Sequence, residues 1–434
     1  MRGAVAGGTV VSSLIPVPEA RSRVLEAVAL LAPRRVRLAD ALGLVTAEPI
    51  VAAGDVPPFT NSAMDGYALR GADASEPPVS LRVVGLVVAG PSVGCVVRPG
   101  EAVRIMTGAP MPDGADAVCM VERAVVAPDG STVTIDHRVR VGDHVRAAGG
   151  DVTAGDEVFP PGTELTAGCL GVLAGLGMAD VLVHPRPVVG VLSTGDELVE
   201  APGALSRGQI HESNRTALLA LLAHSGFTGV DLGIVGDDER AVADALADGA
   251  DRCDAVLTSG GVSVGDRDIV KAVLGEVSRG SMQWMQVAVK PAKPFAFGTI
   301  GDRSTPVFAL PGNPVSALVS FELFARPALR AMAGHAELHR ALAHAVADEE
   351  LARRRDGKLH LVRVAARFGA DGIVHVRSAG GQESHHLHAM ARANALAVLP
   401  DGDGAAQGDR VDVLLLDPAT LGSAGRRAAS GWGA

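Results

Sequence analysis

A glycine-rich turn with hydroxyl and carboxylate side chains spans residues 257–268, between an apolar strand-like run and a helix-like run. The residues of this turn that could bind a ligand or a metal ion are Ser259, Gly260, Gly261, Ser263, Gly265, Asp266 and Asp268. Glycine lets a backbone approach a ligand closely, and the amides at the start of a helix can hold an anion. The turn therefore fits a phosphate-bearing ligand and a metal ion, although a tight turn with an aspartate helix cap would have the same pattern.

Two lysines stand in a proline-stiffened segment, Lys290-Pro291-Ala292-Lys293-Pro294. The chain as a whole carries a net charge of −10, so an anionic ligand would need a local basic site. Two ammonium groups near glycine amides predict such a site, a pocket for an oxyanion or a diphosphate. Solvated surface lysines are the alternative interpretation.

Further carboxylates and hydroxyls follow the strand-like run at residues 188–192. Asp196 and Glu197, with the carboxylates of the glycine-rich turn, predict a shared Mg²⁺, which typically uses one or two protein carboxylates plus phosphate oxygens. Ser193, Thr194 and Ser259 could bond phosphate directly or merely satisfy backbone amides. Each carboxylate could equally cap a helix.

The sequence has neither an H-E-x-x-H pair nor a Walker A loop, and no nucleophile stands out. The chemistry that remains is positioning, charge neutralisation and a metal ion. His385, His386 and His388 invite interpretation as a metal site. Because adjacent histidines on a barrel rarely share one geometry, we disfavour that interpretation.

Strands alternate with helices from Pro187 to Met332, and these elements would position the polar clusters. The strand-like runs are 188–192, 230–235, 255–257, 286–289 and 307–310, and the helix-like runs are 214–224, 238–247, 268–277 and 315–332. This alternation predicts a three-layer α/β domain with a parallel sheet. Each polar cluster comes just past the carboxyl end of a strand, where open α/β sheets bind ligands, so we expect a crevice along this edge.

The flanking segments have other patterns. Residues 18–32 predict a helix, and residues 37–146 a β-rich unit with unusual polar loops at 57–68 and 105–118. A helix at 167–176 is expected to pack beside the first helix, making an elongated linking region from two chain segments. After Gly334 the pattern predicts a small β-barrel, and the tail at 419–434 is expected to be disordered.

Composition limits the class of protein. At 434 residues the chain should divide into roughly three or four units. The net charge argues against general nucleic-acid binding, and no apolar run of about 18 residues predicts a membrane span. The 4 cysteines form no C-x-x-C pair, which fits a reducing cytoplasm, and the first residues do not predict a signal peptide.

Six motifs together resemble the MoeA-type molybdopterin molybdenumtransferases, the family to which the gephyrin E domain also belongs. They are PPFTNSAMDGYA (57–68), IMTGAPMPDGADAV (105–118), STGDEL (193–198), SGGVSVGDRD (259–268), KPAKPFAFG (290–298) and LPGNPVSA (310–317). The resemblance extends from about residue 14 to 418. It implies an elongated linking domain (14–36 and 152–186), a β-rich domain (37–151), a three-layer α/β molybdopterin-binding domain (187–334) and a C-terminal β-barrel domain (335–418).

The resemblance implies that the protein inserts molybdenum from molybdate into adenylylated molybdopterin and releases AMP, with Mg²⁺ present. By residue match, the catalytic positions are Asp65, Thr107, Glu197, Asp268, Lys290 and Lys293, and Asp151 is also functionally important. Glu197 and Asp268 would hold the metal. The molybdopterin-binding positions are Ser193, Thr194, Gly195, Asp196, Glu212, Ser259, Gly260, Gly261, Ser263, Gly265, Pro311 and Pro314.

The resemblance also implies a homodimer whose active cleft lies between the α/β domain of one subunit and the β-rich domain of the other. A molybdopterin adenylyltransferase and molybdoenzyme acceptors would be its protein partners, in the cytoplasm. Two departures concern Glu212, where many relatives have Asp, and Glu383-Ser384-His385, where many have Gly-Ser-His. The longer Glu212 side chain leaves its role, and with it the metal specificity, open.

Two other functions stay open. The chain could be a non-catalytic molybdopterin carrier or scaffold, with Glu212 as a sign of relaxed constraint. It could also be a molybdopterin adenylyltransferase, which acts one step earlier. That activity needs only a compact α/β unit, so the lysine segment, the loop at 57–68 and the extra domains disfavour it.

Overall fold

The computed structural model describes residues 14–91, 94–262 and 269–422. Tertiary contacts divide the chain into two compact units. The first is formed by the chain up to Arg34 together with the chain from His184 onward, and the second by Arg35–Val183. The four-domain boundaries drawn from the sequence remain a prediction. Among the described helices, none combines the length and the apolar character needed to cross a bilayer.

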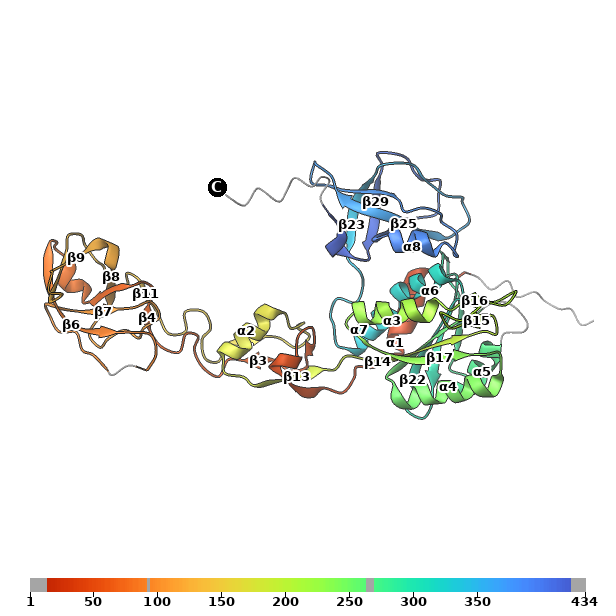
Figure 1. Ribbon diagram of the computed structural model, residues 1–434, viewed down its shortest axis with the longest axis horizontal. Helices are drawn as coiled ribbons and strands as arrows, with labels where there is room; N and C mark the ends of the chain where they lie inside the picture. Colours follow the sequence, from red (N-terminus) through yellow and green to blue (C-terminus); the bar gives the residue numbers. More distant parts are fainter. Residues whose placement is uncertain (1–13, 92–93, 263–268, 423–434) are drawn as a thin grey trace, which may run out of the picture. The chain divides into compact units, whose positions relative to one another are not determined.

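A six-stranded sheet forms the centre of the α/β part of the first unit, in the order β17-β14-β18-β22-β21-β19 (Figure 1). Its strands are β14 (Val188–Thr194), β17 (Thr228–Val235), β18 (Ala255–Ser259), β19 (Gln283–Gln286), β21 (Pro294–Ile300) and β22 (Thr305–Leu310). β14 pairs in parallel with β17 and β18, and β18 with β22, whereas β21 is antiparallel to β22 and β19. The sequence did not predict β21. This antiparallel strand makes the sheet mixed, whereas the sequence predicted a parallel sheet.

Helices cover both faces of this sheet (Figure 1). One face carries α1 (Val17–Glu26), α3 (Asn214–His224), α6 (Pro314–Ser320) and α7 (Arg326–Met332), the last two joined by the π-helical turn η4 (Phe321–Ala325). The other carries α4 (Glu239–Arg252) and α5 (Ile269–Val277). Val189 and Val191 of β14 lie in the first core and Leu192 in the second, the alternation of a strand buried on both faces.

The first helix differs from the sequence prediction in its length and its partner. α1 ends at Glu26, and its apolar stripe of Val17, Ala20 and Val24 is buried in the α/β core. α2 (Ala167–Gly175) belongs to the second unit, and the linking domain of two chain segments remains a prediction. β1 (Arg34–Arg37) pairs with β13 (Asp180–His184).

A closed five-stranded barrel follows the α/β sheet within the first unit. Its strands are β23 (Leu342–Ala347), β25 (Leu359–Phe368), β26 (Val374–Ser378), β27 (Ala395–Leu399) and β29 (Arg410–Leu415). β25 pairs with both β26 and β27, which closes the barrel. Shorter elements are β24 (Leu351–Ala352), β28 (Gly404–Ala405), α8 (Leu387–Arg392) and η5 (Pro418–Thr420). The predicted disordered tail lies outside the described residues from position 423 onward, and its first residues take part in η5.

The two-residue strand β20 (Val289–Lys290) connects the α/β sheet to the barrel. It pairs in parallel with the start of β25, with Lys290 opposite His360. The lysine segment therefore leaves the α/β sheet after β19 and returns to it in β21, and between them it touches the barrel. This detour places Lys290 among barrel residues.

The second unit contains a six-stranded sheet in the order β8-β5-β7-β6-β10-β9. Its strands are β5 (Gly66–Leu69), β6 (Val79–Val87), β7 (Glu101–Ile105), β8 (Ala117–Met120), β9 (Ala124–Val126) and β10 (Thr132–Ile135). Smaller elements are η1 (Leu38–Asp40), β2 (Val45–Thr46), β3 (Ile50–Val51), β4 (Asn61–Ser62), η2 (Gly71–Ala74), η3 (Val121–Arg123), β11 (Val145–Arg146) and β12 (Glu157–Phe159). The β-rich character predicted for this stretch is present, and the two unusual loops flank β5, β7 and β8.

An ionic cluster on the barrel links a histidine to two carboxylates. The Nδ1 atom of His375 lies 2.7 Å from Asp348 Oδ1, and its Nε2 atom lies 3.1 Å from Asp371 Oδ2. Hydrogen bonds to Asp348 and Asp371 raise the pKa of His375. The His375 ring in turn lowers the pKa of Asp348, and the Ile373 amide and the same ring lower the pKa of Asp371.

The barrel should lose stability through this cluster as the pH rises above about 6.5. A raised histidine pKa stabilises the fold fully below the unfolded value of about 6.5, and this stabilisation is lost as the pH rises through the folded value. The lowered aspartate pKa values contribute above about pH 4 and are lost in acid. His375→Gln should therefore flatten the fall in Tm from pH 6 to pH 8, measured by thermal unfolding. An equally steep fall in the variant would assign the dependence to other groups.

Candidate active site

Two cavities share residues along the carboxyl edge of β14, β18 and β22, where the sequence predicts a crevice. The first, the glycine-loop cavity, has a volume of about 430 Å³ and is bounded by Gly260, Gly261, Val262 and Ile269. The second, the α3 cavity, has about 540 Å³ and is bounded by residues 210–214. Residues common to both walls are Thr194, Glu197, Gly260, Gly312 and Asn313.

Gly260 and Gly261 of the predicted turn adopt backbone conformations that residues with a side chain rarely adopt. Gly260 and Gly261 have φ values of 104° and 77°. A Cβ on Gly261 would overlap the side chain of Val270, and one on Gly260 would lie 2.9 Å from the Thr194 carbonyl oxygen. Gly260 and Gly261 can therefore lie directly against β14 and α5, where both residues line the glycine-loop cavity.

Gly261→Ala should destabilise the protein by about 1–3 kcal/mol, because the added methyl combines an unfavourable φ with overpacking against Val270. Gly275→Ala is the matched control. Gly275 lies inside α5, and a Cβ there would meet nothing within 4 Å. This control should stabilise the helix by about 0.5–1 kcal/mol. Urea unfolding of both variants measures the difference, and equal stabilities would contradict the close packing.

Glu197 and Asp196 have different roles although they are neighbours. Glu197 lines both cavities, and its carboxylate occupies the space where a Cβ of Gly195 would lie. Asp196 Oδ1 accepts the backbone N–H of Asp237 at 2.9 Å, so it holds the loop after β17. Asp237, which the sequence did not predict as a site residue, also lines the glycine-loop cavity, as Glu197 does. The glycine-loop cavity thus has two carboxylates in its wall.

Glu212 acts as a helix cap in the structure. Its Oε1 atom accepts the backbone N–H of Arg215 at 2.6 Å and the Ser193 hydroxyl at 3.0 Å. Its Oε2 atom accepts the Thr216 N–H at 3.4 Å. The carboxylate is buried and satisfies amides at the start of α3, which have no partners within the helix. Ser193 is correspondingly engaged and lines neither cavity of the crevice.

Asn214 connects three elements at the wall of the α3 cavity. Its Nδ2 atom donates to Ser259 Oγ and to the Gly312 carbonyl oxygen, both at 2.7 Å. The first residue of α3 is thereby tied to the end of β18 and to the loop after β22. Its Oδ1 atom remains an acceptor at the wall of the α3 cavity. Apart from its place at a helix start, nothing in the sequence marked Asn214 as functional.

A third cavity, the basic cavity, has about 630 Å³ and receives Lys290 from β20 and Arg363 from β25. Arg354 and Arg355 also line it. The Arg363 side chain is buried, and its Nη2 atom donates to the carbonyl oxygens of Gly381 and Glu383 at 2.9 and 3.2 Å. Its Nε atom has no hydrogen-bond partner within the described part of the chain. The cavity is therefore suited to an oxyanion.

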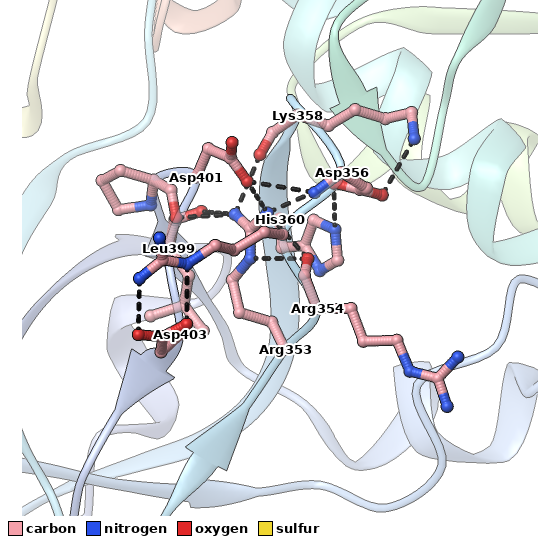
Figure 2. A network of polar contacts seen from close by, with 10 residues as sticks. Arg353, Arg354, Asp356, Lys358, His360, Leu399, Asp401 and Asp403 are labelled. Atoms are coloured by element: carbon pink, nitrogen blue, oxygen red, sulfur yellow. Dashed lines mark hydrogen bonds and ion pairs between the residues drawn. The ribbon is translucent and has the colours of Figure 1, made fainter.

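A polar network holds the arginine-rich wall of this cavity (Figure 2). Arg353 is completely buried, and its Nη1 atom donates to the carbonyl oxygens of Lys358, Leu399 and Pro400 at 2.9, 3.1 and 2.6 Å. Its Nη2 atom lies 2.5 Å from Asp401 Oδ1. Figure 2 shows the neighbouring Arg354 side chain extending away from this network. Arg353 thus fixes the loop, and its neighbours face the cavity.

Two further groups complete the network. Asp356 accepts hydrogen bonds from Lys358 Nζ at 2.8 Å and from His360 Nε2 at 3.1 Å. Burial opposes its charge, but these two bonds outweigh burial and lower the pKa of Asp356 to about 2. Burial and the charge of Arg353 lower the pKa of His360, so its ring is neutral at pH 7 and donates to Asp356.

The two lysines of the predicted pocket are separated. Lys290 lines the basic cavity, whereas Lys293 is exposed and lines none of the three cavities. Between them, buried Ala292 has a φ of 80°, a strained conformation for a residue with a side chain. The segment therefore turns sharply, which explains why the lysines diverge. Pro311 and Pro314 line the glycine-loop cavity and the α3 cavity respectively.

The second unit brings together Asp65 and Thr107, 42 residues apart in the chain. Asp65 Oδ1 accepts the backbone N–H of Thr107 at 2.7 Å and its hydroxyl at 2.8 Å. These bonds, aided by the charge of Arg104, lower the pKa of Asp65. Arg104, missed in the sequence, stacks over the only tyrosine, Tyr67, at 5.1 Å from the ring centroid. Asp151 of the same unit is exposed.

Four predicted residues lie outside the described part of the chain: Ser263, Gly265, Asp266 and Asp268. Among the residues that are described, no group of three or more histidine, cysteine or acidic side chains is placed to hold a metal ion. The histidines at 385–388 accordingly form no such group. His385 instead lines the α3 cavity, and its ring contacts the His386 ring edge-on.

Three family models match the chain in order. Residues 15–177 match the MoeA N-terminal region (domain I and II), residues 190–331 a probable molybdopterin binding domain, and residues 345–416 the MoeA C-terminal region (domain IV). A molybdopterin molybdenumtransferase of Haemophilus influenzae is 37% identical over 392 residues, covering 90% of this chain and 96% of the relative. The chain belongs to the MoeA family of molybdopterin molybdenumtransferases.

Other MoeA family members agree with this assignment. Molybdopterin molybdenumtransferase 2 of Mycobacterium tuberculosis H37Rv is 40% identical over 379 residues, covering 85% of this chain and 91% of the relative. The crystal structure of a molybdopterin biosynthesis MoeA protein from Pyrococcus horikoshii OT3 has a TM-score of 0.78 and 28% identity, and the match covers 93% of this chain and 100% of that one. The family resemblance and the multidomain α/β fold with a C-terminal barrel are confirmed.

Proposed function

We propose that this MoeA family member transfers molybdenum from molybdate to adenylylated molybdopterin and releases AMP. The observation that carries the proposal is the position of the basic cavity relative to the crevice. Gln382 and Glu383 line the basic cavity, and His385, two residues further on, lines the α3 cavity. An oxyanion and a phosphate-bearing pterin can therefore be held on two sides of one short segment.

Each cavity would contribute a distinct part of the chemistry. Lys290 and Arg363 would hold molybdate through charge-assisted hydrogen bonds. The Gly261 amide would hold the diphosphate, which approaches closely because no side chain intervenes, while the Gly260 amide holds the loop by donating to the Leu310 carbonyl oxygen at 3.1 Å. Positioning of the two reactants side by side is itself a large source of rate acceleration.

Mg²⁺ is part of the proposal. Glu197 and Asp237 both line the glycine-loop cavity, and Mg²⁺ commonly uses one or two protein carboxylates together with substrate phosphate oxygens. The donors present fit this pattern. The ion would neutralise charge on the phosphates. Asp268, which lies outside the described residues, stays a predicted metal-binding position.

We further propose the homodimer that the family resemblance implies, with Asp65 and Thr107 of one subunit completing the cleft of the other. Thr107 donates both of its hydrogen bonds to Asp65 Oδ1, and within the described residues no donor contacts Asp65 Oδ2, which supports a role for that oxygen in ligand binding. A cytoplasmic location and contacts with a molybdopterin adenylyltransferase and with molybdoenzymes belong to the same proposal. Sedimentation analysis tests the dimer, and a monomer at assay concentration would refute it.

AMP release from purified protein tests the proposed reaction. Adenylylated molybdopterin is supplied with and without molybdate, and with Mg²⁺ or EDTA. Release that requires both molybdate and Mg²⁺ is the expected result. Tight substrate binding without release would favour the carrier or scaffold function. Formation of adenylylated molybdopterin from ATP and molybdopterin would favour the adenylyltransferase.

A further inference from the structure

The α3 cavity receives one side chain from the barrel. His385 belongs to the segment between β26 and α8, while the other residues of this cavity belong to the α/β part of the unit. The backbone N–H of Val315 donates to the Ser384 carbonyl oxygen at 3.1 Å. This bond fixes the barrel segment next to Asn313 and Pro314, which line the same cavity.

The segment that carries His385 is held rigidly on its other side. The Gln382 side chain bonds both the N–H and the carbonyl oxygen of Arg363, at 2.9 and 3.1 Å. The Arg363 guanidinium donates to the Glu383 carbonyl oxygen at 3.2 Å. Because the backbone is tied at positions 382, 383 and 384, the place of the His385 ring at the cavity is determined by the fold.

Within the described residues, the His385 ring makes no hydrogen bond, although its neighbours in the cavity are engaged. Ser259 accepts from Asn214, Glu212 caps α3, and His211 Nε2 lies 2.8 Å from the Gly203 carbonyl oxygen. The groups left to a ligand include acceptors, the Glu197 carboxylate and Asn214 Oδ1. A ligand in the α3 cavity needs N–H groups that donate to these two acceptors. A carbonyl oxygen on the same ligand would need a hydrogen-bond donor from the protein.

We propose that His385 is a ligand-contacting residue of the crevice: its imidazole donates a hydrogen bond to the heterocyclic end of the pterin substrate in the α3 cavity. A pterin has amino and ring N–H donors for Glu197 and Asn214, and a ring carbonyl oxygen for His385. This inference rests on the proposed function. It gives the barrel a direct part in holding substrate and assigns the pterin ring to the α3 cavity.

Two substitutions at His385 and one control test the proposal. His385→Ala removes the donor, and His385→Gln keeps a donor of similar reach. His388→Ala is the control, since His388 is an exposed histidine on α8 that lines none of the three cavities. Two measurements are made: the KM for adenylylated molybdopterin in molybdate-dependent AMP release, and the binding of free pterin by quenching of its fluorescence.

His385→Ala should weaken pterin binding and raise the substrate KM by about fivefold, the loss of one net hydrogen bond. The KM for molybdate should not change, because Arg363 and Lys290 hold that ligand. His385→Gln should recover most of the loss, and His388→Ala should match wild type. Equal pterin affinity in His385→Ala and His388→Ala would overturn the proposal, as would a change confined to the molybdate KM. If wild type releases no AMP, the proposed function fails, and pterin binding still decides the role of His385.

Discussion

Lys290→Ala is expected to lower molybdate-dependent AMP release by roughly 100-fold at limiting molybdate. Lys290 enters the basic cavity beside the buried Arg363, so its ammonium group would make a charge-assisted bond to the oxyanion. Losing such a bond costs about 1.5–3 kcal/mol, or roughly 10- to 150-fold. The loss should appear as a raised KM for molybdate, measured from initial rates over a molybdate series.

Three variants make this prediction specific. Lys290→Arg, which keeps the charge, should recover part of the activity. Lys293→Ala should lose less than Lys290→Ala, because Lys293 is exposed and lines none of the three cavities. Lys271→Ala on α5, an exposed lysine outside the cavities, should resemble wild type. Equal losses at positions 290 and 293 would show that the lysines act as a pair, as their sequence setting predicts.

The elements best predicted from sequence are those with strong periodicity and clear ends. α3 occupies the predicted range 214–224 residue for residue, and β14 and β18 begin at the predicted residues 188 and 255. Apolar residues recur in them at the spacing of their element, and turn residues bound them. The carboxyl-edge crevice followed from the same alternation of strands and helices, because parallel strands bring their ends to one edge.

β20 and β21 could not be predicted with the same rules. β21 reads as Pro-Phe-Ala-Phe-Gly-Thr-Ile, and its first residue is a proline and its fifth a glycine, two residue types that argue against a strand inside a sheet. β20 has two residues, and its partner β25 begins at Leu359, so its pairing depends on the barrel. These two elements direct Lys290 into the basic cavity and Lys293 to the surface. The separation of the lysines is thus a tertiary effect.

The same limit explains which site residues the sequence missed. Arg363 lies in the middle of an apolar strand, and only the closed barrel makes its guanidinium a cavity wall. Glu212, in contrast, was predicted from the sequence as a molybdopterin-binding residue. In the fold its carboxylate satisfies the amides of α3 and the Ser193 hydroxyl, while the residue also lines the α3 cavity, so its ligand contact stays a prediction. A cap and a ligand-binding carboxylate look alike in sequence because both follow a strand and precede a helix.

Arg353→Met is expected to destabilise the barrel by about 3 kcal/mol. The Arg353 side chain is completely buried, and it satisfies the carbonyl oxygens of Lys358, Leu399 and Pro400 together with Asp401 (Figure 2). Methionine fills similar volume but donates no hydrogen bond, so buried acceptors would be left unpaired. Faster hydrogen exchange of the β25 amides would report this loss locally.

Arg355→Met is the matched control for the same loop. Arg355 makes a bidentate pair with Asp403, but the two side chains are 71% and 82% exposed, so solvent screens the pair and its removal should leave the stability nearly unchanged. Both variants remove one positive charge near the basic cavity, so a general electrostatic effect on molybdate binding would be similar in both. Of the two variants, only Arg353→Met should also accelerate hydrogen exchange of the β25 amides. Arg353 bonds the carbonyl oxygens of Leu399 and Pro400 at the end of β27, whereas Arg355 bonds Asp403. Equal exchange rates in the two variants would mean that the loop is held by other contacts, and that the arginine-rich wall does not depend on this network.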